Sequence, residues 1–432
     1  MQRPVIPLVP AAATAPIVPG ASAAATAPTA PSAPAPRQST VQTFLAPGRI
    51  RLPANPPLSL YVHFPWCVRK CPYCDFNSHE FKGPGEFPED DYLNALRADL
   101  EHSLPWVWGR RIHTVFIGGG TPSLLSAAGL DRMLSDIRAL LPLDADAEIT
   151  LEANPGTFEA AKFAEFRASG VNRLSIGIQS FNPRHLESLG RIHDDRQAHA
   201  AIETAARLFD NFNLDLMFAL PGQTLAESQQ DVETALSYAP PHLSLYHLTL
   251  EPNTLFHRFP PALPDDDASA DMSEWIERRM GEAGFDHYET SAYARPNRQS
   301  RHNLNYWRFG DYLGVGPGAH GKLSFPERVL RQVRHKHPLT YLREAAVDPL
   351  QEQTEIDAAD LPFEFMLNAL RLTEGFPISL FYERTGLPII GIERALRRAE
   401  ASGLLERDHE RIKPTARGRL YLNDLLEMFL RD

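Results

Sequence analysis

The three cysteines of this chain lie within eight residues of one another, at Cys67, Cys71 and Cys74, and no other position holds a cysteine. An odd number of thiols cannot close a complete set of internal disulfides, and three thiolates are too few for a four-thiolate zinc site. Three soft ligands suit a four-iron cluster in which one iron has no protein ligand. The spacing therefore predicts a [4Fe-4S] centre whose open iron can bind a second molecule.

Two basic residues stand inside this cysteine motif. Arg69 and Lys70 are expected to lower the pKa of the thiols or to offset the negative charge of a cluster. Reduced structural thiols are one alternative interpretation of the motif. A zinc site is another, and its fourth ligand would have to come from His63 or His79.

A glycine run is the second pattern with chemical meaning, and it reads Gly118-Gly119-Gly120-Thr121-Pro122. Glycines let backbone N–H groups approach a ligand closely, and a helix N-terminus that follows favours a carboxylate or a phosphate. A plain turn between a strand and a helix would explain the run as well.

Polar residues also recur at the ends of successive predicted strands. Glu152, Gln179 and His247 lie at or near strand ends, and Asp215 lies inside an otherwise apolar strand. A carboxylate in such a strand is costly to bury without a partner. Their recurrence at the carboxyl ends of strands, where barrel sites lie, indicates a shared ligand site.

The elements that must position these residues alternate between strands and helices. Short apolar runs predict strands at 58–63, 112–117, 147–152, 172–178, 213–218 and 242–248. Helical patterns lie between them, near 89–103, 126–140, 158–168, 183–189, 195–209 and 224–238. This alternation predicts an α/β fold with a parallel sheet, and six such units predict a partial (βα)6 barrel with its site at the C-terminal strand ends.

The chain divides into four predicted segments. Residues 1–50 are rich in alanine and proline, contain no acidic residue and are predicted to be disordered. Residues 51–250 would form the partial barrel, and 251–350 a more irregular extension of it. Residues 351–432 are mainly helical with a strand-like stretch at 404–414, which predicts a C-terminal winged-helix-like domain.

Composition limits the functional class. Hydrophobic residues at 43% and charged residues at 22% are ordinary for a soluble globular protein. The net charge of −11, and the alternation of basic and acidic residues in the C-terminal segment, argue against a nucleic-acid partner. No apolar run approaches the ~18 residues of a transmembrane helix. Unpaired cysteines fit a reducing compartment, so we expect a cytoplasmic protein without a transmembrane segment.

The cysteine loop and the glycine run together resemble the radical S-adenosylmethionine (SAM) superfamily, in which the amino and carboxylate groups of SAM chelate the open iron. The stretch from Tyr61 to His320 is similar, more narrowly, to the oxygen-independent coproporphyrinogen III oxidase group. The resemblance implies SAM contacts at Tyr61, Tyr73, Gly119, Gly120, Thr121, Glu152, Gln179, Arg191, Asp215 and Tyr246, with His320 as a further contact.

One position separates two branches of that group. The oxidases carry a further cysteine two residues after the third, where this chain has Phe76. The stretch from Cys67 to His79 and the later segment His302-Asn303-Leu304-Asn305-Tyr306-Trp307, an HNxxYW pattern, are similar instead to the HemW branch. That branch is regarded as haem chaperones. The resemblance therefore implies haem as a ligand and haem-acceptor proteins as partners, including acceptors at a membrane surface.

The HNxxYW segment has chemistry that suits haem. A neutral imidazole is a good axial ligand for haem iron, so His302 is the candidate ligand and His320 its rival. Tyr306 and Trp307 could cover a porphyrin face. The alternative is that His302 is a hydrogen-bonded interior histidine and Trp307 part of the core. The alternative function is the oxidase reaction, the oxidative decarboxylation of coproporphyrinogen III, and cleavage of SAM stays open here.

Overall fold

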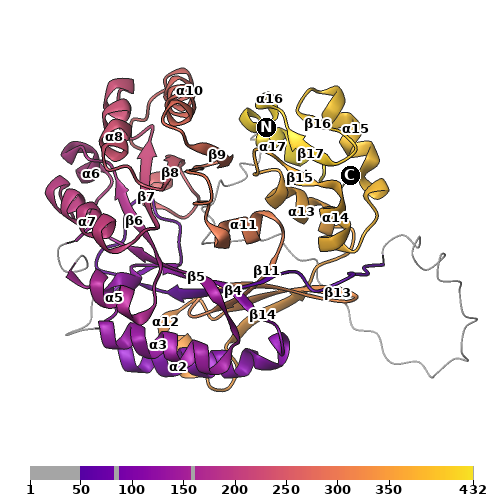
Figure 1. The fold of residues 1–432 in the computed structure, drawn as a ribbon, viewed down its shortest axis with the longest axis horizontal. Helices are drawn as coiled ribbons and strands as arrows, with labels where there is room; N and C mark the ends of the chain where they lie inside the picture. The colour runs from indigo at the N-terminus through magenta and orange to yellow at the C-terminus, as the bar shows by residue number, and fades with distance from the viewer. Residues whose placement is uncertain (1–48, 82–86, 157–160, 432) are drawn as a thin grey trace, which may run out of the picture.

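A mixed sheet of twelve strands forms the centre of the molecule, in the order β14-β13-β12-β11-β1-β4-β5-β6-β7-β8-β10-β9 (Figure 1). The structure is a computed structural model and describes residues 49–81, 87–156 and 161–431. The predicted disordered segment lies outside the described residues except for its last two positions. The part of the sheet that carries the site is its run of parallel strands.

Seven neighbouring strands are parallel, and they are β11 (Asp311–Val315), β1 (Leu58–Phe64), β4 (Ile112–Gly119), β5 (Leu143–Ala153), β6 (Arg173–Gln179), β7 (Phe212–Phe218) and β8 (His242–His247). Antiparallel strands extend both edges, and they are β9 (Asp286–Glu289), β10 (Ala292–Ala294), β12 (His320–Phe325), β13 (Arg328–Arg334) and β14 (Leu350–Glu355). The six predicted strands are therefore confirmed as β1 and β4 to β8. The prediction of an irregular 251–350 segment is wrong, because most of that segment forms ordered strands and helices.

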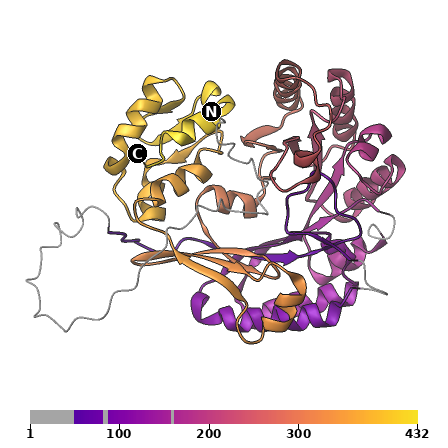
Figure 2. The ribbon, with the colours of Figure 1, turned by 180° about the vertical axis from the view of Figure 1, so that it is seen from behind.

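Helices cover the outer face of the parallel strands (Figures 1 and 2). They are α2 (Glu89–Val107), α3 (Ala127–Leu140), α5 (Phe163–Ser169), α6 (Pro183–Ser188), α7 (Asp195–Leu208), α8 (Leu225–Ser237) and α10 (Asp266–Glu282). The largest hydrophobic core lies between these helices and the outward side chains of the strands, such as Leu60, Ile176 and Leu214. Alternate strand residues point to opposite faces, so the residues between these apolar ones face the inside of the barrel.

Short helices complete this part of the chain, and they are η1 (Pro122–Leu124), α9 (Leu255–Arg258), α11 (Arg301–Trp307) and α12 (Pro338–Glu344). Helix α11 contains the HNxxYW segment. The carboxylate of Glu148, on the inner face of β5, accepts hydrogen bonds from the backbone N–H groups of Arg301 (3.3 Å) and His302 (3.1 Å). A carboxylate at a helix N-terminus is stabilising, and here it holds α11 against the inner face of the barrel.

A buried ion pair ties the added strands to the barrel helices. Asp99 of α2 lies 3.1 Å from Arg334 of β13, and both side chains are almost completely buried. The Asp99 carboxylate also accepts from the Tyr341 hydroxyl (2.8 Å) and from the backbone N–H of Gly316 (3.1 Å). Such a charge can be buried because several donors satisfy it.

The C-terminal part is mainly helical, as predicted, and has its own core. Its helices are α13 (Leu361–Ala369), α14 (Ile378–Thr385), η2 (Ile389–Ile392), α15 (Glu393–Ala401), α16 (Ala416–Leu420) and α17 (Leu422–Glu427). A small sheet contains β15 (Phe376–Pro377), β17 (Arg411–Pro414) and β16 (Leu405–Arg407). The strand-like stretch predicted at 404–414 forms the antiparallel pair β16–β17. Arg419 of α16 bonds Glu277 of α10 at 3.0 Å, which links this domain to the barrel side of the molecule.

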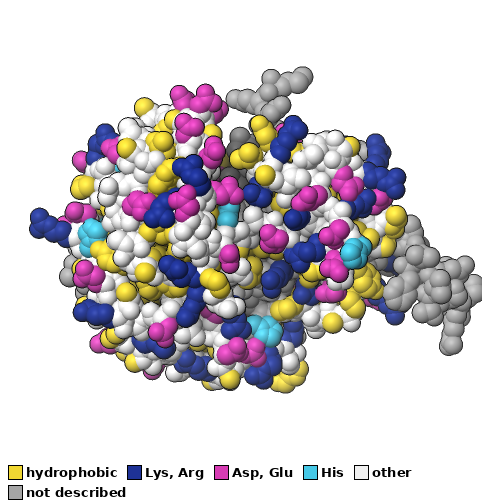
Figure 3. Space-filling model, turned by 45° about the horizontal axis from the view of Figure 1, so that its top comes forward, with side chains coloured by type: hydrophobic (Ala, Val, Ile, Leu, Met, Phe, Trp, Pro, Cys, Tyr) yellow, Lys and Arg dark blue, Asp and Glu magenta, His cyan; other side chains and the backbone are white. Residues whose placement is uncertain are grey.

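On the face drawn in Figure 3, lysine and arginine side chains alternate with aspartate and glutamate instead of gathering in one basic patch. Among the helices of the described residues, none is both long enough and apolar enough to cross a membrane.

Candidate functional site

A cavity of about 800 Å³ runs along the inner face of the barrel, from the cysteine loop to the C-terminal domain. Its size is at the upper end of the about 300–1,000 Å³ that is common for small-molecule and cofactor sites. It is lined by these predicted site residues: Cys67, Cys71, Cys74, Tyr73, Gly119, Gly120, Thr121, Glu152, Gln179, Arg191, Asp215 and Tyr246. Three other predicted residues, Tyr61, His302 and His320, do not line it.

The cysteine loop follows β1 and is tied down at both ends. Its first residues form β2 (Trp66–Cys67), which pairs with β3 (His79–Glu80) after the third cysteine. The Lys70 ammonium donates hydrogen bonds to the carbonyls of Phe76 (3.0 Å) and Ser78 (3.1 Å). Lys70 therefore closes the loop across the three cysteines.

The thiols are half-buried and carry no disulfide. No group of three His, Cys, Asp or Glu side chains within the described ranges is arranged to hold a single metal ion. In a four-iron cluster each thiolate binds a different iron, so this donor set fits a cluster better than one zinc ion. His63 is no spare zinc ligand, because its Nε2–H donates to the Asn77 carbonyl (3.0 Å) and its Nδ1 faces the Tyr61 hydroxyl (2.9 Å).

Burial controls the protonation of these thiols. It raises the pKa of Cys67, against the opposing effect of a hydrogen bond from Thr121. Burial also raises the pKa of Cys74 to about 11, although the nearby Lys70 charge acts in the other direction. The expected lowering by a basic residue is therefore present for Lys70, but burial outweighs it at both thiols. A metal site must then supply the positive charge that removes their protons.

The backbone N–H groups of the glycine run form hydrogen bonds within the protein. Gly120 donates its N–H to the Phe64 carbonyl (2.6 Å), and Thr121 donates its N–H to the Trp66 carbonyl (2.8 Å). A Cβ on Gly120 would lie 2.4 Å from the Trp66 carbonyl oxygen. These two N–H groups are therefore occupied within the protein, and the run lets β4 approach the cysteine loop. Contacts of Gly119, Gly120 and Thr121 with SAM stay a prediction.

Glu152 of β5 stands between this run and the interior. Its Oε2 accepts the N–H of Gly119 at 2.9 Å. Burial raises the pKa of Glu152 to about 8, and the negative charge of Asp215 adds to the rise. A carboxyl group with such a pKa, beside a cavity, is typical of a functional site.

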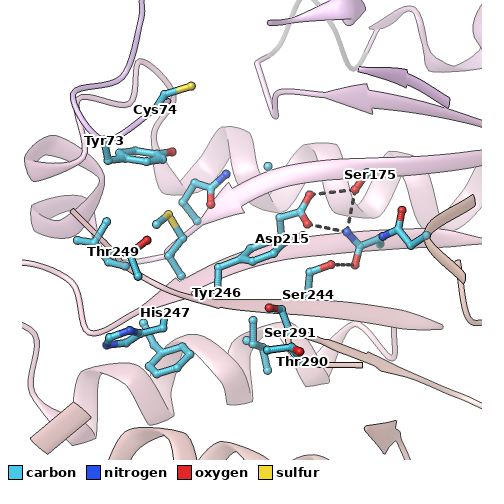
Figure 4. A pocket seen from close by; sticks show the side chains of 18 of the residues that line it. Tyr73, Cys74, Ser175, Asp215, Ser244, Tyr246, His247, Thr249, Thr290 and Ser291 are labelled. Carbon is cyan, nitrogen blue, oxygen red and sulfur yellow. Dashed lines mark hydrogen bonds between the residues drawn. The ribbon is translucent and has the colours of Figure 1, made fainter. Parts of the chain in front are cut away.

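Asp215 of β7 is the second buried carboxylate of the cavity. It accepts from the Ser175 hydroxyl (2.9 Å) and from the Asn213 amide (2.8 Å). Figure 4 shows these bonds, with Ser244 and Tyr246 on the neighbouring strand. Burial raises the pKa of Asp215 despite these donors. The carboxylate that the sequence marked as costly is therefore paired.

Arg191 links the cysteine loop to the strand ends. Its guanidinium donates to Asn154 Oδ1 (2.7 Å) and to the Gly177 carbonyl (2.7 Å), and lies 3.8 Å from the sulfur of Cys71. Gln179 ends β6 with a positive φ of 68°, a conformation that non-glycine residues adopt rarely. Asn154, which also lines the cavity, was missed by the sequence analysis although it follows a predicted strand.

Two tyrosines form walls of the cavity. Tyr73 comes from the cysteine loop, and its ring centroid lies 6.4 Å from that of Phe256. Tyr246 extends from β8, as Figure 4 shows. Burial raises the pKa of both hydroxyl groups, so both stay neutral at physiological pH. These rings supply apolar surface with a polar end, which suits an aromatic ligand.

His302 lies in the interior, 1% exposed, on the barrel side of α11. Its Nδ1 lies 2.7 Å from the Thr114 hydroxyl, and its Nε2 lies 3.2 Å from the Tyr306 hydroxyl. Burial lowers the pKa of His302 to about 3. With both nitrogens engaged, this ring does not offer an axial position to haem in this arrangement. His302 as a haem ligand stays a prediction that requires it to leave these partners.

His320 and Tyr61 are also placed away from the cavity. His320 begins β12, and burial lowers its pKa to about 4. Tyr61 packs against Phe116 and Ala319. Of the HNxxYW segment, Asn303 lines the cavity, whereas Trp307 is buried beneath the Arg371 guanidinium, 4.3 Å from it.

Comparison with known proteins places this geometry in a class. The Radical SAM superfamily matches residues 61–235, and the HemN C-terminal domain matches residues 356–421. The coproporphyrinogen III oxidase HemN from Escherichia coli, a radical SAM enzyme, has a similar solved structure. Its TM-score is 0.75 at 24% identity, covering 91% of this chain and 93% of that chain. The fold is thus an α/β radical SAM fold, as predicted.

Sequence relatives narrow the class. The chain is 51% identical over 377 residues to the Heme chaperone HemW of Escherichia coli (strain K12), covering 87% of this chain and 98% of the relative. It is 46% identical over 385 residues to that of Haemophilus influenzae, covering 88% and 99%. It is 34% identical over 379 residues to that of Bacillus subtilis, covering 86% and 99%. The chain therefore belongs to the HemW family of radical SAM proteins.

Proposed function

We propose that this protein is a haem chaperone that carries a [4Fe-4S] cluster and an exchangeable SAM, and that passes haem to acceptor proteins. The 51% identity to a protein named Heme chaperone HemW, over 87% of this chain, is the observation that carries the proposal. The cavity supports it, because one continuous space reaches from the cysteine loop to the C-terminal domain. Such a space can hold a cofactor at one end and a flat aromatic ligand beyond it.

The residues of the cysteine loop fit the cluster. Cys67, Cys71 and Cys74 line one cavity and would each bind one iron. When bound, the cluster supplies an iron that SAM can chelate. Glu152 and Asp215 offer carboxylate oxygens to donor groups of SAM, and they lie on the strands that follow the loop. These residues would bind SAM and orient it, without a catalytic step of their own.

A haem titration tests the proposal. The anaerobically reconstituted protein and its Cys67→Ala variant are titrated with haem, and the Soret band is followed for the shift that marks binding. We expect a saturable shift with one haem per chain in the reconstituted protein, and transfer of that haem to an apo-haem protein added afterwards. A titration without saturation would contradict haem binding.

The oxidase reaction is the competing function, and Phe76 speaks against it because the oxidase motif has cysteine there. Phe76 itself lines the cavity, beside the three cysteines. Incubation of the reduced, reconstituted protein with coproporphyrinogen III and SAM separates the two functions. Formation of protoporphyrinogen IX over several turnovers would overturn the chaperone assignment, and its absence alongside haem transfer supports it.

A further inference from the structure

One buried guanidinium in the cavity has no partner. Arg173 begins β6, its side chain faces the inside of the barrel, and it is 2% exposed. It lines the same cavity as the cysteines. Its Nε is buried without a hydrogen bond, and no hydrogen bond or ion pair of this guanidinium is found among the described residues. A buried charge without a partner is strongly destabilising, which indicates that a ligand provides the partner.

Two carboxylates on the strands beside Arg173, Asp215 of β7 and Glu148 of β5, are engaged elsewhere. Asp215 accepts from Ser175 and Asn213. Glu148 accepts from the backbone at the start of α11. Neither carboxylate forms an ion pair with the guanidinium within 4.0 Å. Both carboxylates therefore leave the donor groups of Arg173 available.

Two buried histidines that feel the charge of Arg173 stay neutral. Burial lowers the pKa of His242 and of His302, and the charge of Arg173 lowers both further. The His242 ring is held by Asn213 Oδ1 (2.6 Å) and the Tyr288 hydroxyl (2.9 Å), and it forms an uncharged part of the cavity wall. These two neutral rings therefore provide no counter-ion for Arg173.

The position of Arg173 within the barrel separates it from the cluster. It stands at the amino end of β6, whereas Gln179 and the cysteine loop lie at the carboxyl ends of the strands. At about 3.3 Å per residue, the six steps from Arg173 to Gln179 span about 20 Å. A SAM molecule that chelates iron through its own carboxylate would have that carboxylate at the far end.

We propose that Arg173 binds a carboxylate of the ligand that occupies the cavity, and that this carboxylate is a propionate of haem. The assignment rests on the proposed haem-chaperone function. A guanidinium recognises a carboxylate through two parallel hydrogen bonds, which an ammonium cannot reproduce. Asn303 of the HNxxYW segment lines the same cavity with an unpartnered, buried Oδ1.

The test compares haem with haem dimethyl ester, in which both propionates are esterified. Dissociation constants of the two ligands are measured for the wild-type protein, Arg173→Gln and Arg173→Lys. Arg419→Gln is the matched control, because that arginine lines the same cavity but is already paired with Glu277. We expect Arg173→Gln to weaken haem binding at least about tenfold and to leave ester binding unchanged. Arg173→Lys should fall between, and the control should keep the wild-type ratio.

The ratio of the two constants is read within each variant, so a partly misfolded fraction affects both ligands alike. An unchanged ratio in Arg173→Gln would overturn the inference while haem binding by the wild type upholds the chaperone function. No haem binding by the wild type would instead overturn the function itself. SAM binding to reconstituted Arg173→Gln is measured in parallel. Loss of SAM binding with haem binding intact would assign the guanidinium to SAM and refute the propionate subsite.

Discussion

Replacement of Lys70 by methionine should loosen the cysteine loop without touching a cysteine. The ammonium of Lys70 donates to the carbonyls of Phe76 and Ser78, both of which follow the third cysteine. Methionine has a similar length and cannot donate either bond. A hydrogen bond from a charged donor contributes about 1.5–3 kcal/mol, and a half-buried lysine belongs at the lower limit. Two bonds then total about 3 kcal/mol, which is roughly a hundredfold in the population of the closed loop.

The assay is the rate at which the reconstituted protein loses iron to an excess of chelator, followed by its visible absorbance. Arg69→Met is the matched control, since it removes the same charge from the neighbouring position. Arg69 is exposed and has no hydrogen bond among the described residues. We expect Lys70→Met to lose iron much faster than the wild type and Arg69→Met to behave nearly like it. Equally accelerated iron loss in both variants would show that the positive charge matters and the closure of the loop does not. Iron loss at the wild-type rate in Lys70→Met would likewise refute the role of its two hydrogen bonds.

Three further changes test other parts of the structure. His302→Gln removes a buried histidine whose pKa is about 3, against an ordinary 6.5. Between pH 6.5 and about 3, the histidine binds a proton in the unfolded chain but not in the folded protein. The free energy of unfolding of the wild type therefore falls as the pH decreases through this range, by about 2 kcal/mol at pH 5. Urea unfolding at pH 7.5 and 5.0 should show a pH-dependent loss smaller by that amount in the variant, and an equal loss would refute the assigned pKa. Asp99→Ala leaves its buried arginine partner unpaired, and chemical denaturation should show about 3–5 kcal/mol less stability; a change below about 1 kcal/mol would contradict the pair. Gly120→Ala places a Cβ 2.4 Å from the Trp66 carbonyl, so iron uptake should fall, whereas Gly281→Ala, with open space around it, should reconstitute normally.

The barrel could be predicted from sequence because its determinants are local. Each of its strands has apolar residues at alternate positions, and the helices between them repeat at helical spacing. Strands β9 to β14 were not predicted, and all of them except the parallel β11 are antiparallel additions to the two sides of the barrel sheet. Strand β14, for example, has mostly exposed polar residues and pairs only with β13. Pairing with a neighbouring strand holds such a strand in place, and its own residue pattern does not predict that pairing.

The structure brings predicted residues together in one cavity where chain order alone determines their position. Cysteines after the first strand and polar residues at later strand ends must meet, because parallel strands end on one side. The inward-facing Arg173, Asn213 and His242 were missed, although strict alternation with apolar neighbours marks them as facing the interior. Asp215, which the sequence placed inside an apolar strand, belongs to the same inward-facing series. A search for polar residues at every second strand position would have found all four.

The HNxxYW segment shows why a motif cannot be assigned one role as a block. Helix α11 lies against the inner face of the barrel, and its residues divide by direction. His302 bonds Thr114 of the wall, Trp307 packs under Arg371, and only Asn303 of these three reaches the cavity. Substituting His302 or Trp307 would therefore disturb the wall that shapes the cavity, and lost haem binding in such variants would not identify an axial ligand. Asn303 is the member of the segment to substitute, because Asn303→Ala alters the cavity surface and leaves the bonds of His302 intact. Weaker haem binding in this variant would then report a contact with the ligand and not a disturbed wall.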